Sequence, residues 1–416
     1  MFFGAGNLIF PPFLGTQAGK SVWIAMAGFA FSAIGLPILG VAAVAKSGGL
    51  MVLGGRVHKN FAFIFTLLIY LSIGPGLAIP RTASTSFEMA VVPFIGEHLS
   101  LTSARMIYSV VFFTIAMALA MNPDKLIDRL GKILTPCLLT LILVLFIGSI
   151  MKSMGSYYTP REAYEKLPFV VGFLDGYQTM DTIAALNFGS IISINIMAKG
   201  VKEENIIVRE TMKAGVIAGI VLIAVYGALA HIGALTSSSG IHAQNGAEVL
   251  TYAAHTLFGP IGMILLAIIF FIACLNTCIG LLSCCSEYFH SLIPKISYKK
   301  WVMIFAAISL AIANLGLNKI LEISVPILNA IYPLAIVLIF LAFLDRFIGK
   351  FHYVYPIGML ATGFTSVIDA LQKAGIKIPF LTELIQRLPF YEIGLSWMIP
   401  AILGIAVGLI LSVRDL

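Results

Sequence analysis

Apolar runs long enough to cross a lipid bilayer follow one another along the whole chain, and they constrain the fold more than any other feature. A membrane-spanning helix needs about 20 consecutive apolar residues, because the hydrocarbon layer is about 30 Å thick. The runs are too long for strands and lack the two-residue alternation of a membrane β-barrel. They lie at 1–17, 22–45, 61–80 (or, as a longer alternative, 61–95), 103–121, 126–151, 168–198, 206–235, 260–290, 299–316, 320–344, 353–372 and 394–413. The sequence therefore predicts an all-α polytopic membrane protein.

Composition excludes several classes of function. Hydrophobic residues make up 59% of the 416 and charged residues only 11%, whereas soluble proteins carry about 25% charged residues. A water-soluble enzyme is excluded on this basis, and the runs hold no H-E-x-x-H or similar catalytic cluster. The net charge of +7 comes from basic residues in short loops. The distribution of this charge among the loops therefore predicts a membrane topology with both termini in the cytoplasm. It does not indicate nucleic-acid binding.

Helix-breaking residues lie at the centre of the first run. Gly4 and Gly6 permit irregular backbone, which survives at membrane depth only where it lines a cavity or is buried in protein. We expect a helix to begin near Leu8, with free N–H groups that suit a carboxylate. Asn7 adds a carbonyl oxygen and an amide. A glycine-rich helix-packing interface is the alternative.

The run at 168–198 is broken in a similar way. Asp175, Gly176 and Asp181 lie in otherwise apolar sequence, and an ionisable group inside the membrane indicates a functional site. Asp181 is expected to coordinate or relay a cation, to bind a substrate ammonium, or to accept hydrogen bonds from freed N–H groups. Asp175 is either functional or the cap of a helix start.

These breaks fall in the first and sixth spans. Spans one to five and six to ten would then be repeats of opposite orientation, because five is odd, and paired broken helices indicate a transporter's central site. We expect a single transmembrane domain, 1–416, with an N-terminally incomplete repeat at 1–151, a second repeat at 168–344 and two additional helices at 353–413.

A third group of polar residues lies in the run at 260–290. Asn276 and Thr277 bring a carbonyl and a hydroxyl oxygen to mid-membrane, and the Ala273 carbonyl lies one turn earlier. With the carbonyl of Phe3, these neutral oxygens would form a Na⁺ site. The alternative is that Thr277 bonds to its own helix and Asn276 bonds to a neighbour.

Span three is also interrupted by glycine and proline at 74–88. Its two charged residues, Arg81 and Glu88, are candidates for an ion pair that gates the outer vestibule. A plain anchor at the lipid interface is the alternative for Arg81.

Three motifs carry a family resemblance, namely FFGAGNLIFPP (2–12), GPGLAIPRTASTSFE (74–88) and GFLDGYQTMDTIAALNFG (172–189). They resemble signatures of the bacterial branched-chain amino acid:cation symporter family, the BrnQ type, and the resemblance extends over the whole chain. It implies a LeuT-like fold of five-plus-five inverted repeats in the bacterial cytoplasmic membrane. It also implies import of leucine, isoleucine and valine with Na⁺ or H⁺ and no cofactor. Family members have a basic tail and a further half-helix before the first motif, which we expect to be missing here.

The resemblance also implies residue roles. Gly4, Ala5 and Gly6 would bind the substrate carboxylate through backbone N–H groups. Ala273 and Thr277 match ligands of a LeuT-type second sodium site, where Asn276 replaces a hydroxyl residue. Phe10 stands where such carriers have a gating arginine, and Arg81 is a candidate substitute. The predicted substrate-binding set is Gly4, Ala5, Gly6, Asn7, Tyr70, Asp181, Thr182, Ile183 and Phe188.

Other functions remain open at this point. A LeuT-fold carrier for another neutral amino acid or a nucleobase fits the same motifs, and a channel fits them less well. The expected partners are the small-molecule substrate and the lipid bilayer, with no nucleic acid.

Overall fold

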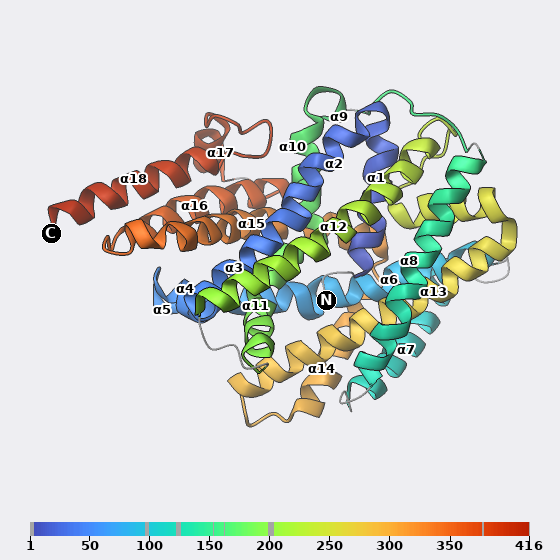
Figure 1. Ribbon diagram of the computed structural model, residues 1–416, viewed down its shortest axis with the longest axis horizontal. Helices are drawn as coiled ribbons and strands as arrows, with labels where there is room; N and C mark the ends of the chain where they lie inside the picture. Colours follow the sequence, from blue (N-terminus) through green and yellow to red (C-terminus); the bar gives the residue numbers. More distant parts are fainter. Residues whose placement is uncertain are drawn as a thin grey trace. The chain divides into compact units, whose positions relative to one another are not determined.

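The computed structural model describes residues 4–95, 100–121, 126–152, 154–161, 163–198, 204–376 and 378–415. Within these ranges all regular elements are helical (Figure 1). The first half contains α1 (Ala5–Ala18), η1 (Gly19–Ser21), α2 (Val22–Ala30), η2 (Phe31–Gly35), α3 (Leu36–Ser47), α4 (Leu50–Gly55), α5 (Lys59–Leu71), η3 (Ser72–Gly76), α6 (Ala78–Ala90), η4 (Val92–Phe94), α7 (Leu101–Ala120) and α8 (Leu126–Met151). The second half contains α9 (Ala163–Lys166), α10 (Pro168–Asp175), η5 (Gly176–Thr179), α11 (Asp181–Ala198), α12 (Glu204–Thr236), α13 (Gly246–Leu292), α14 (Tyr298–Ala313), α15 (Leu317–Ile348), α16 (Val354–Lys373), α17 (Pro379–Gln386) and α18 (Met398–Arg414).

Each predicted apolar run coincides with one or more of these helices. In the described ranges, seven helical stretches are long and apolar enough to cross a membrane, and two shorter apolar helices accompany them. The long stretches are Gly6–Ser47, Lys59–Phe94, Leu101–Ala120, Ile206–Thr236, Gly246–Leu292, Leu317–Ile348 and Val354–Lys373. The shorter helices are Thr135–Met151 and Met398–Arg414. Twelve crossings therefore stay a prediction.

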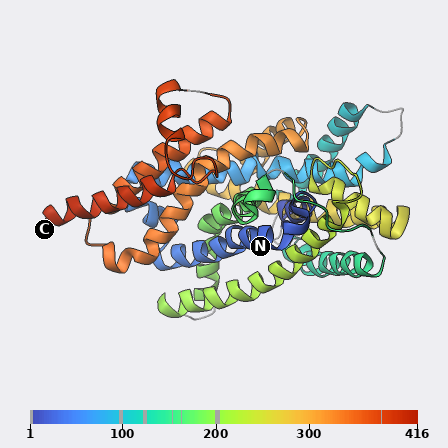
Figure 2. The same ribbon diagram turned by 90° about the horizontal axis from the view of Figure 1, so that it is seen from above.

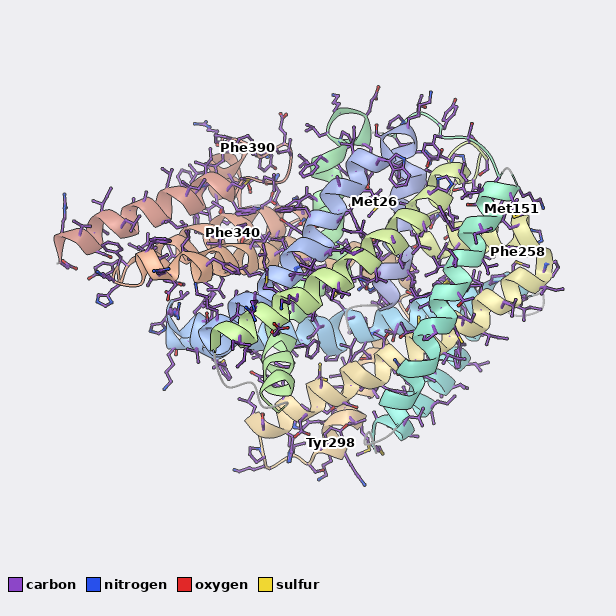
Figure 3. The ribbon with its side chains drawn as sticks, in the orientation of Figure 1. Met26, Met151, Phe258, Tyr298, Phe340 and Phe390 are labelled. Atoms are coloured by element: carbon purple, nitrogen blue, oxygen red, sulfur yellow. The ribbon has the colours of Figure 1, made fainter. Side chains whose placement is uncertain are left out.

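Large apolar side chains project from the outer faces of the helices. Met151 at the end of α8 is 82% exposed, and Phe258 on α13 is 43% exposed (Figure 3). A water-soluble chain would bury such side chains, since each costs about 1.5–3 kcal/mol when left in water. Their exposure fits helices that are surrounded by lipid.

Internal contacts divide the chain into two compact units. Unit 1 comprises Met1–Gly28, Tyr70–Asp175 and Ile223–Glu322, and unit 2 comprises Phe29–Ile69, Gly176–Leu222 and Ile323–Leu416. Each unit takes segments from both of the predicted repeats, 1–151 and 168–344. The repeat boundaries themselves stay a prediction.

Helix α13 forms the core of unit 1. It packs against α1, α6, α7, α8 and α14, and its course beside α7 and α8 can be followed in Figure 1. The helix is 47 residues long and bends at Gly259, where φ is +64° and Pro260 follows. Glycine reaches this left-handed conformation without steric cost. The bend explains why the predicted run begins at residue 260.

Glycines bring α1 and α12 of unit 1 into backbone contact. A Cβ atom on Gly15 would collide with the Ala230 carbonyl, and one on Gly233 would collide with the Pro12 carbonyl. Small residues permit this close approach between membrane helices. The packing fixes α1, which carries the first of the predicted breaks.

Unit 2 has two main helix pairs. Helix α3 packs against α11, where Gly40 lies against Ala185 and Gly189 against Val41 and Val44. Helices α16 and α18 lie side by side (Figure 2).

Candidate functional site

The first break lies at the start of α1. The helix begins at Ala5, and not near Leu8 as the sequence predicts. Gly4 precedes it in an extended conformation, with φ −118° and ψ −174°. The Asn7 Oδ1 atom accepts the Gly4 N–H at 3.2 Å, and this cap between the N-cap and the third helical residue accounts for the earlier start. The N–H groups of Ala5 and Gly6 keep no acceptor inside their own helix.

Asn7 joins this helix start to α12. Its side chain is 2% exposed, and its Nδ2 atom donates a hydrogen bond to the hydroxyl of Tyr226 on α12. Both ends of the amide are therefore held, which fixes its orientation. Tyr226 is fully buried, and sequence reasoning missed it. A tyrosine inside an apolar span was the available signal, because its hydroxyl needs a partner when buried.

Arg81 on α6 lies against the same helix start. Its guanidinium is over the ring of Phe10, 5.3 Å from the centroid. A Cβ atom on Gly6 would lie 2.7 Å from Arg81 Nη2 and 3.3 Å from the Phe10 ring. The Arg81 side chain is buried, with 3% exposed. Glycine at position 6 is therefore what lets a buried cation approach the open end of α1.

The predicted pair of Arg81 with Glu88 is not formed in the described part of the chain. Both residues belong to α6, seven positions and so about 10 Å apart along the axis. Glu88 instead interacts electrostatically with Arg105 and Glu248. The side chain of Arg81 turns toward α1 instead. The prediction that Arg81 and Glu88 form an ion pair is therefore wrong.

Two of the predicted cation ligands on α13, Ala273 and Thr277, lie in contact with each other. The Thr277 hydroxyl donates to the Ala273 carbonyl at 3.0 Å. This is the bond within its own helix that the sequence analysis gives as the alternative to an ion site, and it also places the two oxygens close enough to share one ion. The Oδ1 atom of Asn276 is buried and has no hydrogen-bond partner among the described residues. Gly4 lies beside this group, since a Cβ atom there would be 3.9 Å from Thr277 Oγ1. Phe3, the remaining predicted ligand, lies outside the described residues.

Tyr70 belongs to unit 1 as well. Its ring stacks on Tyr288 of α13, with centroids 3.8 Å apart. The carbonyl of Tyr70 accepts a hydrogen bond from Cys285 Sγ at 3.7 Å. These contacts tie the end of α5 to α13, and a contact of Tyr70 with substrate stays a prediction.

The second break lies between α10 and α11. After α10 come the short 3₁₀ helix η5 and then Met180, whose φ is +63°. A residue other than glycine is strained in this backbone conformation. Asp175 ends α10 and accepts a hydrogen bond from the Tyr164 hydroxyl. The 3₁₀ helix η5 begins at the next residue, Gly176, and α11 begins at Asp181.

The predicted residues of α11 lie in unit 2. Asp181 is the first residue of the helix and is 5% exposed, and its N–H donates to Thr179 Oγ1 at 3.4 Å. A carboxylate is favoured there by the helix dipole. The Thr182 hydroxyl donates to the Ser32 carbonyl at 3.1 Å, so it also supports the backbone. Ile183 and Phe188 are buried.

Asn187 on α11 was missed by the sequence analysis. It is 6% exposed, and neither Oδ1 nor Nδ2 has a hydrogen-bond partner among the residues that the structure describes. A buried amide in this state needs an explanation, because each unsatisfied polar group costs about 1–3 kcal/mol. Its place in the 172–189 motif was the available signal.

Comparison with known families decides the assignment. Residues 1–414 match a family model described as "Branched-chain amino acid transport protein". The chain belongs to this family. A relative from Bacillus subtilis (strain 168), the branched-chain amino acid permease BraB, is 42% identical over 99% of this chain and 93% of its own length. The predicted family is confirmed. Relatives are named as permeases and carriers, so this family member is a membrane transporter and not an enzyme.

Solved structures establish the fold of this transporter. Mhp1 in its inward-facing conformation matches with a TM-score of 0.58 at 14% identity, over 99% of this chain and 89% of Mhp1. MhsT in complex with L-phenylalanine matches with a TM-score of 0.54 at 16% identity, over 98% of this chain and 95% of MhsT. Such low identities show the fold alone. The predicted LeuT-like fold is confirmed.

Proposed function

We propose that this chain imports leucine, isoleucine and valine by symport with Na⁺ or H⁺. The family and the names of its relatives support the substrate class. The observation that carries the mechanism is local to unit 1, where the open start of α1 lies against the oxygen cluster of α13. One helix end can thereby serve both the substrate anion and the coupling cation.

The carboxylate of the amino acid would bind at the start of α1. The N–H groups of Ala5 and Gly6 point out of the helix end, where the macrodipole places about half a positive charge. The guanidinium of Arg81 adds a full charge beside Gly6. In this proposal Arg81 closes over the bound carboxylate and acts as the gate without Glu88.

The coupling cation would bind to the carbonyl of Ala273, the hydroxyl of Thr277 and Oδ1 of Asn276. These are neutral oxygens, which suit a hard monovalent ion. Such an ion would satisfy the Asn276 oxygen and hold Gly4 against α13. Because each ligand then favours the conformation that binds the other, their affinities rise together. Proton coupling would leave these oxygens without that role.

For α11 we propose a separate set of substrate contacts on its own geometry. Asp181 would accept a hydrogen bond from the substrate ammonium, and Asn187 would supply a donor and an acceptor. Ile183 and Phe188 would contact the apolar side chain, and Thr182 would hold the helix start in place. We also propose that both termini lie in the cytoplasm of a bacterial cell.

Uptake into proteoliposomes tests the function. Radiolabelled leucine should accumulate under an imposed inward Na⁺ or proton gradient and should be displaced by unlabelled isoleucine and valine. Alanine and uracil serve as competitors from the alternative substrate classes. Downhill flux without saturation or counterflow would identify a channel, and displacement by uracil alone would identify a nucleobase carrier.

The cation site is tested by two adjacent substitutions. Thr277→Ala removes a ligand oxygen, whereas Cys278→Ala removes a buried thiol of similar size on the same helix. We expect Thr277→Ala to raise the cation concentration for half-maximal uptake by about tenfold, since a ligand contact is worth about 1–3 kcal/mol. Thr277→Ser keeps the hydroxyl and should restore the affinity. Equal and mild effects of the alanine variants would remove α13 from the proposal.

A further inference from the structure

Unit 2 has an apolar groove that the transport mechanism does not use. The groove has a volume of about 890 Å³ and is lined by residues of α5, α15 and α16 with the segments that precede α5 and α16. Its walls are almost wholly apolar, with side chains such as Phe61, Leu68 and Phe364. Leu360 at the groove is 73% exposed and Phe364 is 47% exposed. The groove is therefore open along the outer face of these membrane helices.

The groove has the length of one lipid leaflet. On the α5 side its lining runs from Val57 to Leu68, which at 1.5 Å per residue is about 17 Å. One leaflet of hydrocarbon is about 15 Å thick. An acyl chain lying along the groove would therefore keep its headgroup at one end and its methyl group near the bilayer centre.

Only one end of the groove is polar. His58 and His352 line it there, beside Tyr353. Lys59 follows His58 directly, and Lys350 precedes His352 by two residues, both with exposed side chains. This end is also where the two chain segments enter α5 and α16.

The lysines at this end have no ion-pair partner among the described residues. Asp345 is the one acid within residues 53–68 and 334–367, and it is engaged by Arg56 at 2.5 Å. Tyr355 completes that cluster, since its hydroxyl donates to Asp345 at 3.0 Å and accepts from Arg56 at 3.2 Å. Lys59 and Lys350 form no ion pair in the described part of the chain.

We propose that this groove binds an anionic glycerophospholipid, with one acyl chain along α5 and α16 and the phosphate between Lys59 and Lys350. Apolar walls alone would take any lipid or a second copy of the chain. The unpaired lysines select an anionic headgroup, because basic pockets between membrane helices attract anionic lipid. The Arg56–Asp345–Tyr355 cluster holds the polar end together and leaves these lysines available.

Native mass spectrometry can test the proposal. The protein would be extracted from vesicles of mixed phosphatidylethanolamine and phosphatidylglycerol, and the lipid that it retains would be identified. We expect the wild type to retain phosphatidylglycerol in preference to phosphatidylethanolamine. In the double variant Lys59→Gln/Lys350→Gln, the affinity for phosphatidylglycerol should fall by up to about 25-fold, since each basic residue contributes about fivefold to it. The matched control Lys299→Gln/Lys300→Gln removes the same charge from the first turn of α14 and should retain the lipid.

A second pair of variants tests the apolar part. Gly363 lines the groove, and a Cβ atom there would lie 3.3 Å from the Leu334 side chain, so Gly363→Leu adds bulk inside it. This variant should lose the lipid, whereas Ile402→Phe on the exposed face of α18 should keep it. Equal retention of both phospholipids, or equal phosphatidylglycerol in all variants, would overturn the proposal. A dimer that Gly363→Leu dissociates would overturn it too, because a second chain would then be the occupant.

Discussion

The starts of α1 and α11, where the two predicted breaks lie, differ in backbone conformation and in charge. At the first break Gly4 is extended, Asn7 accepts its N–H, and α1 follows without strained backbone. The second passes through the 3₁₀ helix η5 and a strained Met180 before Asp181 starts α11. One break presents a positive helix end with a buried arginine beside it. The other places its own carboxylate on the helix end.

This difference indicates a division of labour. Free N–H groups beside a guanidinium attract an anion, whereas a carboxylate already present at a helix start repels one and attracts a cation or an ammonium. Each of the four predictions below weakens or sharpens this contrast, and they are ordered by the size of the expected effect.

Gly6→Ala should cause the largest loss. The new Cβ atom would lie 2.7 Å from the end of the Arg81 side chain, which can move away, so the fold should persist while the guanidinium is displaced. We expect leucine uptake to fall by about a hundredfold, because a hydrogen bond to a charged group is worth up to about 3 kcal/mol. Gly55→Ala is the control, since a Cβ atom there meets nothing within 4 Å. Normal uptake by Gly6→Ala would mean that Arg81 does not serve the anion.

Asn187→Leu probes the second break. Leucine has a similar volume and removes a buried amide that has no protein partner among the described residues. If substrate satisfies the amide, the KM for leucine should rise by about tenfold while thermal stability increases, since two hydrogen bonds are worth about 1–3 kcal/mol. Higher stability with an unchanged KM would show that Asn187 does not bind the substrate.

Tyr226→Phe tests the support of the first break. It removes the hydroxyl that accepts a hydrogen bond from the Asn7 amide. We expect a rise in the KM for leucine of about fivefold, with maximal uptake rate preserved, because one hydrogen bond is worth about 1 kcal/mol. Tyr298→Phe removes a comparable hydrogen bond to the Ala120 carbonyl of unit 1. It should lower stability without changing KM, and the same result for Tyr226→Phe would make that residue purely structural.

Met180 variants should show the smallest effect on uptake. At the φ of +63° found at Met180, a β-branched side chain is more strained than an unbranched one. Met180→Ile should therefore be less stable than Met180→Leu by about 1–2 kcal/mol, because a strained backbone conformation lowers stability by an amount of this order. The midpoint of thermal unfolding in detergent measures the difference. Equal midpoints would show that the second break relaxes to ordinary backbone.

The sequence determined the broad architecture, because its signals are local. Runs of apolar residues predict helices in lipid wherever they occur, and glycine or aspartate at their centres marks the breaks. The interruption between α10 and α11 was found in this way, and Gly4 marks the start of α1. The cation site of Ala273, Asn276 and Thr277 stays a prediction. Family motifs then supplied the substrate class, which no physical signal in the apolar runs could give.

Tertiary structure decided which side chains meet. The bond between Asn7 and Tyr226 and the turn of Arg81 toward Phe10 both depend on neighbours distant in the sequence. Asn7 and Tyr226 are 219 positions apart, and no periodicity relates residues at such a distance. A buried polar group must find a partner somewhere, but only the packing of helices against one another determines which partner it finds.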